Sequence, residues 1–410
     1  MINGVHGFFF GKLAGQYILK PENMDGHILI VGGAGSGKSS GIAIPSLMTW
    51  KERVFCIDIK GELYKNTAHI RPNIKVFDPL NSTSYGYNPF YVLKETNNPA
   101  QEVEAMSLVL VPLPPEAKDP FWIESARNML TGAMLHFYKE GLSFIETMTQ
   151  ILSTPVTKLI DDIYDNTKIE EAKLYINSFI DMNNETLIGI YAELSRHIMI
   201  FATDKNIKEC LSRNKKIIPA DLEGKSDIYI CIPEYLLRQW KNLLTLMVSQ
   251  FLRHFEKRPD MQASPILFLL DEFPRLGKIE GITDAFATLR SKKITISAII
   301  QSLAQLDLIY GKETRRVIAD NCQYKAVLNA TDAESQEYFS KIVGKYDKII
   351  ISNSKNYSPI AKFPTGSRVS RNPQERYRIN PEEFATIDYI ALFTPFGFFK
   401  VEKDPYYKHN

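Results

Sequence analysis

Short apolar runs recur along this chain and alternate with longer segments of helical periodicity. A run without polar alternation is typical of a strand buried on both faces, as in parallel sheets covered by helices. These runs lie at residues 28–31, 54–57, 74–77, 227–232, 266–270, 294–300 and 324–328. The pattern predicts an α/β fold with a mainly parallel sheet, in which helices connect successive strands.

The strand pattern is interrupted between residues 98 and 219, where helical periodicity replaces it. Residues 120–140 should form one long helix with an apolar stripe. The stripe consists of Trp122, Ala126, Met129, Ala133 and Phe137. We therefore expect a sheet-forming domain in two parts, residues 1–97 and 220–410, interrupted by an all-α insertion domain, residues 98–219.

Charge is unevenly distributed, although 49 Lys and Arg against 47 Asp and Glu give a net charge of only +2. Residues 101–220 sum to −5, which leaves +7 for the remainder. Residues 341–380 hold nine basic and two acidic side chains, again +7. Such a block is either a solvated face or a contact for a polyanion. Because residues 351–375 are rich in Ser, Asn and Pro, we expect a mobile loop or disordered tract there.

The sequence Gly-Gly-Ala-Gly-Ser-Gly-Lys-Ser at residues 32–39 is a complete phosphate-loop motif. It follows the apolar run 28–31 and precedes a helix expected at residues 39–47, which Pro45 should kink. Glycines allow backbone N–H groups to point at phosphates, the lysine reaches the β- and γ-phosphates, and the serine hydroxyl binds Mg²⁺. The motif predicts an ATP and Mg²⁺ site formed by Gly32, Gly33, Ala34, Gly35, Ser36, Gly37, Lys38, Ser39 and Ser40.

Two acids follow the apolar run 266–270, in the position where such chains place their catalytic carboxylates. Asp271 is expected to hold Mg²⁺ together with Ser39, directly or through water. Glu272 is expected to orient and deprotonate the attacking water, a role that fits hydrolysis. Gln301, which ends the run 294–300, is either a sensor of the γ-phosphate or a polar strand cap.

Phosphoryl transfer also needs a cation for the charge of the transition state. Four arginines after the acids could supply it, and the residues alone leave them nearly equal. They are Arg275, Arg290, Arg315 and Arg316. Surface solvation is the ordinary alternative for each of them.

Together these motifs resemble the type IV secretion coupling proteins, the TraG/TraD-like conjugative DNA-transfer ATPases of the FtsK/HerA-like P-loop motor superfamily. The resemblance covers nearly the whole chain. It is carried by separate blocks: Gly32–Ser39, Asp58–Glu62, Asp78–Leu80, Tyr87–Pro89, Phe121-Trp122, Leu270–Pro274, Gln301–Leu306 and Asp404–Tyr407.

The resemblance implies a RecA-like motor domain, interrupted by the all-α domain and assembled as a homo-hexamer around DNA. It assigns the cation that reaches a neighbour's nucleotide to Arg290. It also implies that the all-α domain receives a relaxase or other secretion substrate, while the motor contacts components of the type IV secretion channel. We expect a cytoplasmic chain, docked at the inner face of the membrane through a partner or a missing N-terminal anchor.

Three functions remain open at this stage. The first is an ATP-driven motor that feeds DNA, single- or double-stranded, or a protein–DNA complex into a conjugative channel. The second is a coupling ATPase that delivers protein effectors without translocating DNA. The third is a non-hydrolysing switch, which Glu272 argues against because a switch needs no activated water.

Overall fold

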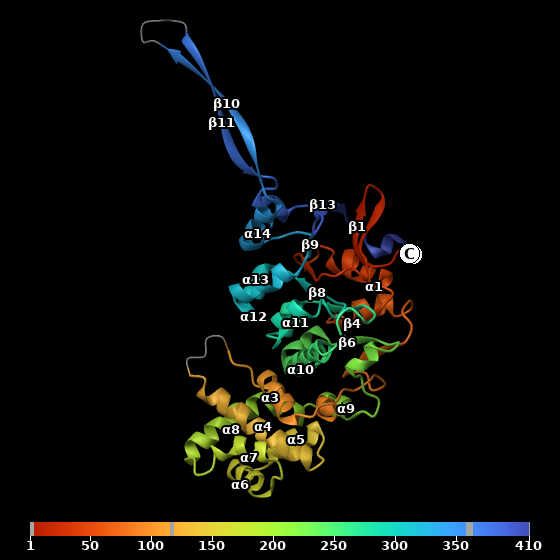
Figure 1. Ribbon diagram of the computed structural model, residues 1–410, viewed down its shortest axis with the longest axis vertical. Coiled ribbons are helices and arrows are strands. Elements are labelled where there is room, and N and C mark those ends of the chain that lie inside the picture. The colour runs from red at the N-terminus through yellow and green to blue at the C-terminus, as the bar shows by residue number, and fades with distance from the viewer. Residues whose placement is uncertain (1–3, 115–118, 358–363, 410) are drawn as a thin grey trace.

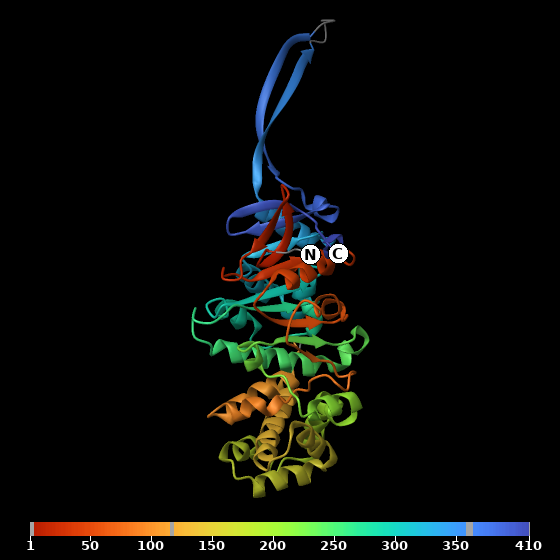
Figure 2. The same ribbon diagram turned by 90° about the vertical axis from the view of Figure 1, so that its right-hand side faces the viewer.

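The computed structural model describes residues 4–114, 119–357 and 364–409. The molecule is elongated and has three levels along its long axis (Figures 1 and 2). A sheet with helices on its faces forms the middle, a group of helices lies at one end, and a two-stranded ribbon projects from the other.

The central sheet contains eleven strands in the order β2-β1-β13-β12-β9-β3-β8-β7-β4-β6-β5. The seven apolar runs of the sequence all form strands of this sheet, and each pairs in parallel with its neighbours among them. They are β3 (Ile28–Val31), β4 (Arg53–Asp58), β5 (Ile74–Phe77), β6 (Asp227–Cys231), β7 (Ile266–Leu270), β8 (Ile294–Ile300) and β9 (Tyr324–Val327). The expected parallel α/β sheet is confirmed.

Four antiparallel strands extend this sheet beyond β9, and the sequence patterns did not predict them. They are β1 (Phe8–Leu13), β2 (Gln16–Lys20), β12 (Tyr389–Thr394) and β13 (Gly397–Glu402). Lys12 of β1 pairs with Glu402 of β13, so strands near the two ends of the sequence lie side by side. Phe8, Phe9 and Phe10 are buried there.

Helices cover both faces of the sheet. One face carries α1 (Ile44–Thr49) and α2 (Glu62–Thr67), whose apolar side chains join those of alternate strand positions in one core. The other face carries α10 (Leu237–Glu256), α11 (Ile282–Thr288), α12 (Leu303–Tyr310), α13 (Lys312–Asn321) and α14 (Ala333–Val343). Because the seven central strands are parallel, their carboxyl ends all lie at one edge of the sheet, which is where ligands of open α/β sheets bind.

Between β5 and β6, the described residues form helices and no strand, apart from isolated bridges at Tyr85, Gly86 and Lys216. The helices are the 3₁₀ segments η2 (Pro89–Lys94) and η3 (Pro219–Leu222) with α3 (Pro99–Leu110), α4 (Phe121–Lys139), α5 (Phe144–Ser153), α6 (Val156–Asn166), α7 (Glu170–Asn177), α8 (Asn184–Thr203) and α9 (Lys205–Ser212). The long helix expected at 120–140 is α4, and four members of its stripe are buried. Trp122, the fifth member of the stripe, is 39% exposed and packs against Gly189 of α8.

The expectation of a mobile or disordered tract at 351–375 was wrong for the described residues. Strands β10 (Lys345–Tyr357) and β11 (Pro364–Tyr377) pair as a long antiparallel ribbon beyond α14. Backbone pairing between adjacent strands needs no core, which is why a polar, basic sequence can adopt it. Ile349, Ile351 and Val369 are 63%, 58% and 59% exposed on this ribbon. Residues 358–363 lie outside the described part of the chain.

Candidate nucleotide site

The phosphate loop lies at the centre of the sheet's carboxyl edge, between β3 and the first helical turns after it. Two backbone N–H groups fix it to the neighbouring strands. Gly32 donates to the carbonyl oxygen of Ile300 at 3.2 Å, and Gly33 donates to Oδ1 of Asn329 at 2.6 Å. The loop therefore takes its shape from β8 on one side and from the end of β9 on the other.

The glycines of the loop are required by its conformation. Gly35 and Gly37 have φ values of +73° and +94°, in the left-handed region that favours glycine. At Gly32, an added Cβ would lie 2.4 Å from Oγ of Ser36, which is closer than real atoms approach. Ser36 Oγ is buried and has no hydrogen-bond partner among the described residues. A narrow backbone cradle with a spare hydroxyl donor fits a phosphate group.

Lys38 lies within this cradle. Its Nζ donates to the carbonyl oxygens of Gly32 at 2.6 Å and Gly33 at 3.1 Å, and the residue is only 8% exposed. Burial lowers the pKa of the ammonium group, while the charges of Glu272 and Asp271 partly offset that effect. These carboxylates are therefore close enough for their charges to act on Lys38.

The helix after the loop begins at Ser39, as expected, but its first turn is wider than an α-helix. Ser39–Ala43 form a π-helical turn, η1, in which the N–H of Ile44 donates to the carbonyl oxygen of Ser39. The α-helix α1 follows, with Pro45 in its first turn, where a proline needs no N–H partner. Pro45 is the second residue of α1, directly after the π-helical turn η1.

Asp271 and Glu272 follow β7 at the same edge and are 6% and 5% exposed. The pKa of Asp271 is raised to about 7, chiefly by burial and then by the charges of Glu272 and Asp58. Glu272 has a φ of +48°, a left-handed conformation that costs energy for a residue other than glycine. Such strain is common where a side chain is held for function, and it turns the chain sharply after β7.

Gln301 contacts Glu272 directly. Its Nε2 donates to both carboxylate oxygens of Glu272, at 3.1 and 3.3 Å, and its backbone N–H donates to Oε1 of Gln305. The ends of β7 and β8 are therefore joined by a side-chain contact next to the phosphate loop. Strand spacing predicted that these residues would be near each other, but not that they would bond.

Three further residues of the site were not predicted. Asp58 ends β4 and accepts a hydrogen bond from the N–H of Tyr64 at 2.8 Å, while burial raises its pKa. Lys60 is exposed, yet its charge acts on the pKa of both Lys38 and Asp271. Asn329 holds the loop at Gly33, as described above. Asp58 could have been found, because it ends an apolar strand as Asp271 does.

Among the four candidate arginines, three form ion pairs within the chain. Arg275 pairs with Glu234, Arg315 with Asp307 at 3.0 Å and Arg316 with Glu313 at 2.9 Å.

Arg290 is exposed and forms no ion pair or side-chain hydrogen bond with the described residues. It precedes β8, so it lies at the amino edge of the sheet, about 20 Å along β8 from Gln301. Its charge is one of the causes, after burial and Lys20, that lower the pKa of His27 to about 3 at the start of β3. Arg290 is therefore remote from the nucleotide site of its own chain.

The raised pKa of Asp271 predicts a pH-dependent effect on stability. The carboxyl group titrates near pH 4 in the unfolded chain and near 7 in the folded chain, so ionisation increasingly destabilises the fold between these values. Without nucleotide or Mg²⁺, Asp271→Asn should raise the melting temperature at pH 8 and have a much smaller effect at pH 4.5. Asp161→Asn, at an exposed helical position, is the control. An equal shift at both pH values would contradict this explanation.

Comparison with known families agrees with this geometry. The family described as "Type IV secretory system Conjugative DNA transfer" matches residues 3–409 of this chain. The chain belongs to this family. The suspected resemblance to type IV secretion coupling proteins is thereby confirmed.

Relatives of this family member are moderately similar in sequence. VirD4 of Rhizobium radiobacter is 26% identical over 401 residues, which cover 94% of this chain and 57% of the relative. TraG of the same organism is 24% identical over 376 residues, covering 87% and 58%. The chain thus spans somewhat more than half the length of the curated relatives it matches.

Solved structures similar to this family member show the same fold. The conjugative coupling protein TrwBdeltaN70 superposes with a TM-score of 0.74 at 18% identity, over 96% of this chain and 88% of that one. VirB4 of Thermoanaerobacter pseudethanolicus gives 0.59 at 14% identity, over 98% of both chains. The expected RecA-like P-loop α/β fold is confirmed. Among the described residues, no helix combines the length and apolar character needed to cross a bilayer.

Proposed function

We propose that this protein is an ATP-hydrolysing coupling motor that recruits DNA or a protein–DNA substrate and pumps it into a conjugative type IV secretion channel. One observation carries the proposal: a phosphate loop with a buried lysine lies beside a buried Asp-Glu pair that a glutamine contacts. Both a phosphate cradle and a candidate general base are needed for hydrolysis, whereas binding alone needs only the cradle.

Each residue then has a defined role. Lys38 and the loop amides bind the phosphates, and Ser40, which follows the motif, is included in the proposed nucleotide site. Glu272 orients and deprotonates the attacking water. Gln301 has two roles: its side chain holds the Glu272 carboxylate, and it senses whether a γ-phosphate is bound.

Ser39 and Asp271 would hold Mg²⁺, whose charge would stabilise the phosphate oxygens during transfer. The described residues contain no cluster of three or more His, Cys, Asp or Glu side chains that could cage a metal. Mg²⁺ that is bound mainly through substrate phosphates, one carboxylate and water needs no such cage. Solved structures of TrwB contain ADP with Mg²⁺, an ATP analogue or a GTP analogue, which supports ATP and Mg²⁺ here.

We further propose that Arg290 acts on the nucleotide of a neighbouring subunit in a homo-hexamer. The nucleotide site and Arg290 lie at opposite edges of the same sheet, and a head-to-tail ring brings such different surfaces together. Within the described parts of the chain, Arg290 also has no ion pair that it would have to lose. In this arrangement a single subunit has an incomplete catalytic centre.

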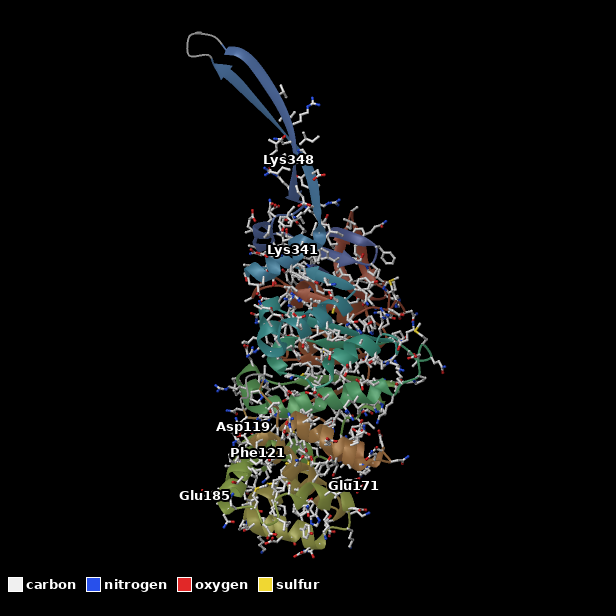
Figure 3. The ribbon with its side chains drawn as sticks, turned by 60° about the vertical axis from the view of Figure 1, so that its left-hand side comes forward. Asp119, Phe121, Glu171, Glu185, Lys341 and Lys348 are labelled. Carbon is white, nitrogen blue, oxygen red and sulfur yellow. The ribbon has the colours of Figure 1, made fainter. Side chains whose placement is uncertain are left out.

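The division into motor parts 1–97 and 220–410 and an all-α domain 98–219 gives the molecule two functional ends. Glu171 and Glu185 lie on the helical end, whereas Lys341 and Lys348 lie at or on the ribbon at the opposite end (Figure 3). The negative charge of the helical end suits a basic protein such as a relaxase better than bare DNA. The motor would dock at the inner face of the membrane, through a partner or an N-terminal anchor, beside the channel components.

The same charge distribution favours a second candidate function, a coupling ATPase that delivers protein effectors without translocating DNA. ATP hydrolysis measured with and without single- or double-stranded DNA distinguishes the two. A DNA motor should hydrolyse ATP faster with DNA, and the stimulation should weaken steeply with salt because phosphate contacts release counterions. Hydrolysis that DNA does not change would favour the protein receptor. A complete lack of turnover in Mg-ATP would contradict both.

A further inference from the structure

The block Asp404–Tyr407 is one of those that carry the family resemblance, yet the chemistry proposed above uses none of its residues. It follows β13, which is antiparallel to β12, as β12 is to β9. Therefore β13 runs in the same direction as β9 and ends at the edge of the sheet that holds the phosphate loop. The block begins beside the nucleotide site.

Lys403 connects this segment to the phosphate loop. Its Nζ donates to the carbonyl oxygen of Leu328 at 3.1 Å. The side chain of Leu328 in turn lies against the loop, because an added Cβ on Gly32 would be 3.2 Å from Cβ of Leu328. A single residue thus separates the start of the segment from the loop that would hold the phosphates.

Beyond Lys403 the chain crosses the helical turn that follows the loop. The 3₁₀ helix η7 (Tyr406–His409) packs against η1, and the hydroxyl of Tyr406 donates to Oδ1 of Asn66 in α2 at 3.0 Å. On the other side, buried Asp404 pairs with Lys12 at 3.1 Å. The segment is therefore held at both ends while it crosses the element nearest the phosphates.

A bound nucleotide has a γ-phosphate end and a base end. The order of the strands places the protein groups that could contact each end on opposite sides of β3. Glu272 and Gln301, which would face the γ-phosphate, come from β7 and β8 on one side of β3. The segment comes from β13, beyond β9 on the other side of β3. A triphosphate with its γ-phosphate at Glu272 therefore directs its ribose and base away from β7 and towards this segment.

The segment presents an aromatic ring at that place. Tyr407 is 60% exposed, and its ring centroid lies 5.7 Å from that of Tyr406 at an interplanar angle of 71°, an edge-to-face contact. Tyr406 is itself held by Asn66 and by the apolar core under α1. Tyr407 thus has an open face on a supported backbone, which is the requirement for stacking on a nucleobase.

We propose that residues 404–408 form the base side of the nucleotide site, with the ring of Tyr407 stacking on the purine. The inference rests on the proposed binding of nucleotide by the phosphate loop. Because every base offers a π-face, stacking accepts adenine and guanine alike. Specificity between purines is therefore not expected from Tyr407.

Calorimetric titration of the full chain with Mg-ATP, Mg-GTP and inorganic tripolyphosphate tests this site. Tyr407→Ala should weaken binding of ATP and of GTP about ten-fold, the size expected for one stacking contact. Tripolyphosphate has no base, so its affinity should stay unchanged. Tyr407→Phe should bind all three like the wild type. Tyr346→Ala, which removes an exposed tyrosine from the ribbon, is the matched control and should change nothing.

Three outcomes would overturn the inference, and one of them would also contradict the proposed binding of nucleotide. Unchanged ATP affinity in Tyr407→Ala would remove the ring from the site and leave the phosphate-loop proposal intact. An equal loss for tripolyphosphate would mean that the segment merely supports the loop. A wild-type chain that binds neither ATP nor tripolyphosphate would instead contradict the proposed nucleotide binding itself. Thermal unfolding of each variant identifies any that fail to fold.

Discussion

Glu272→Gln is expected to bind Mg-ATP with near wild-type affinity and to hydrolyse it about a hundred- to ten-thousand-fold more slowly. Glutamine has almost the same shape and can still bond to Gln301, but it cannot take a proton from water. Because Glu272 acts on the attacking water, its loss should affect the chemical step and spare the ground state. Nucleotide titration and steady-state phosphate release measure the two effects separately.

Lys38→Ala gives the complementary result, because Lys38 meets the phosphates before any bond breaks. Tight ATP binding should disappear, and hydrolysis with it.

The matched control for Glu272→Gln is Glu313→Gln, which removes the charge of an exposed carboxylate outside the site and should be normal in both assays. Near-normal turnover by Glu272→Gln would show that another group activates the water.

Arg290→Ala should fold, bind ATP and lose most of its turnover, since a trans-acting arginine can contribute about a thousand-fold or more. The wild type should then hydrolyse ATP slowly when dilute and faster when protein concentration or DNA promotes a ring. Because Arg290 is exposed and unpaired among the described residues, its removal should not destabilise the subunit. Arg196→Ala, at an exposed arginine of α8 that pairs with Glu193 in the helical part of the chain, is the matched control.

Mixing the two inactive variants makes this test specific for action between subunits. In rings that contain Arg290→Ala and Glu272→Gln subunits, some interfaces combine an intact Glu272 with an intact Arg290. Measurable activity should return at those interfaces, whereas an arginine that acts within its own subunit predicts no recovery. Failure to recover in rings shown to be mixed would exclude Arg290 and reopen the question for Arg275, Arg315 and Arg316.

Local sequence was sufficient to predict the parallel sheet and most of the residues at the edge that carries the candidate nucleotide site. Apolar runs form buried strands wherever they occur, and the carboxyl ends of parallel strands share one edge, so 32–39, Asp271 and Gln301 could be grouped in advance. The positive φ values of Gly35 and Gly37 follow from the motif as well. The pKa of Asp271 and the hydrogen bonds of the site did not follow, because that pKa depends on burial first and then on the charges of Glu272 and of Asp58, which ends another strand.

Patterns failed where pairing partners are distant or where composition is misleading. Strands β1 and β13 pair with each other, although almost the whole chain separates them, and neither reads as a parallel core strand. The polar composition of 351–375 suggested a mobile loop or disorder, yet the described residues of this tract pair in an antiparallel ribbon. Secondary-structure propensity describes one segment at a time, whereas the pairing of β1 with β13 and of β10 with β11 each depends on a second strand.

By itself, the sequence determined the fold class, the phosphate loop and the order of the candidate catalytic side chains along the chain. Each depends on residues that are close in sequence or on the general rule for strand ends. Only the tertiary structure decided that Gln301 bonds to Glu272, that Asn329 fixes Gly33, that Arg290 lies at the far edge of the sheet and that Tyr406–His409 crosses η1. These contacts join residues far apart in the chain, and the packing that brings them together has no local signature.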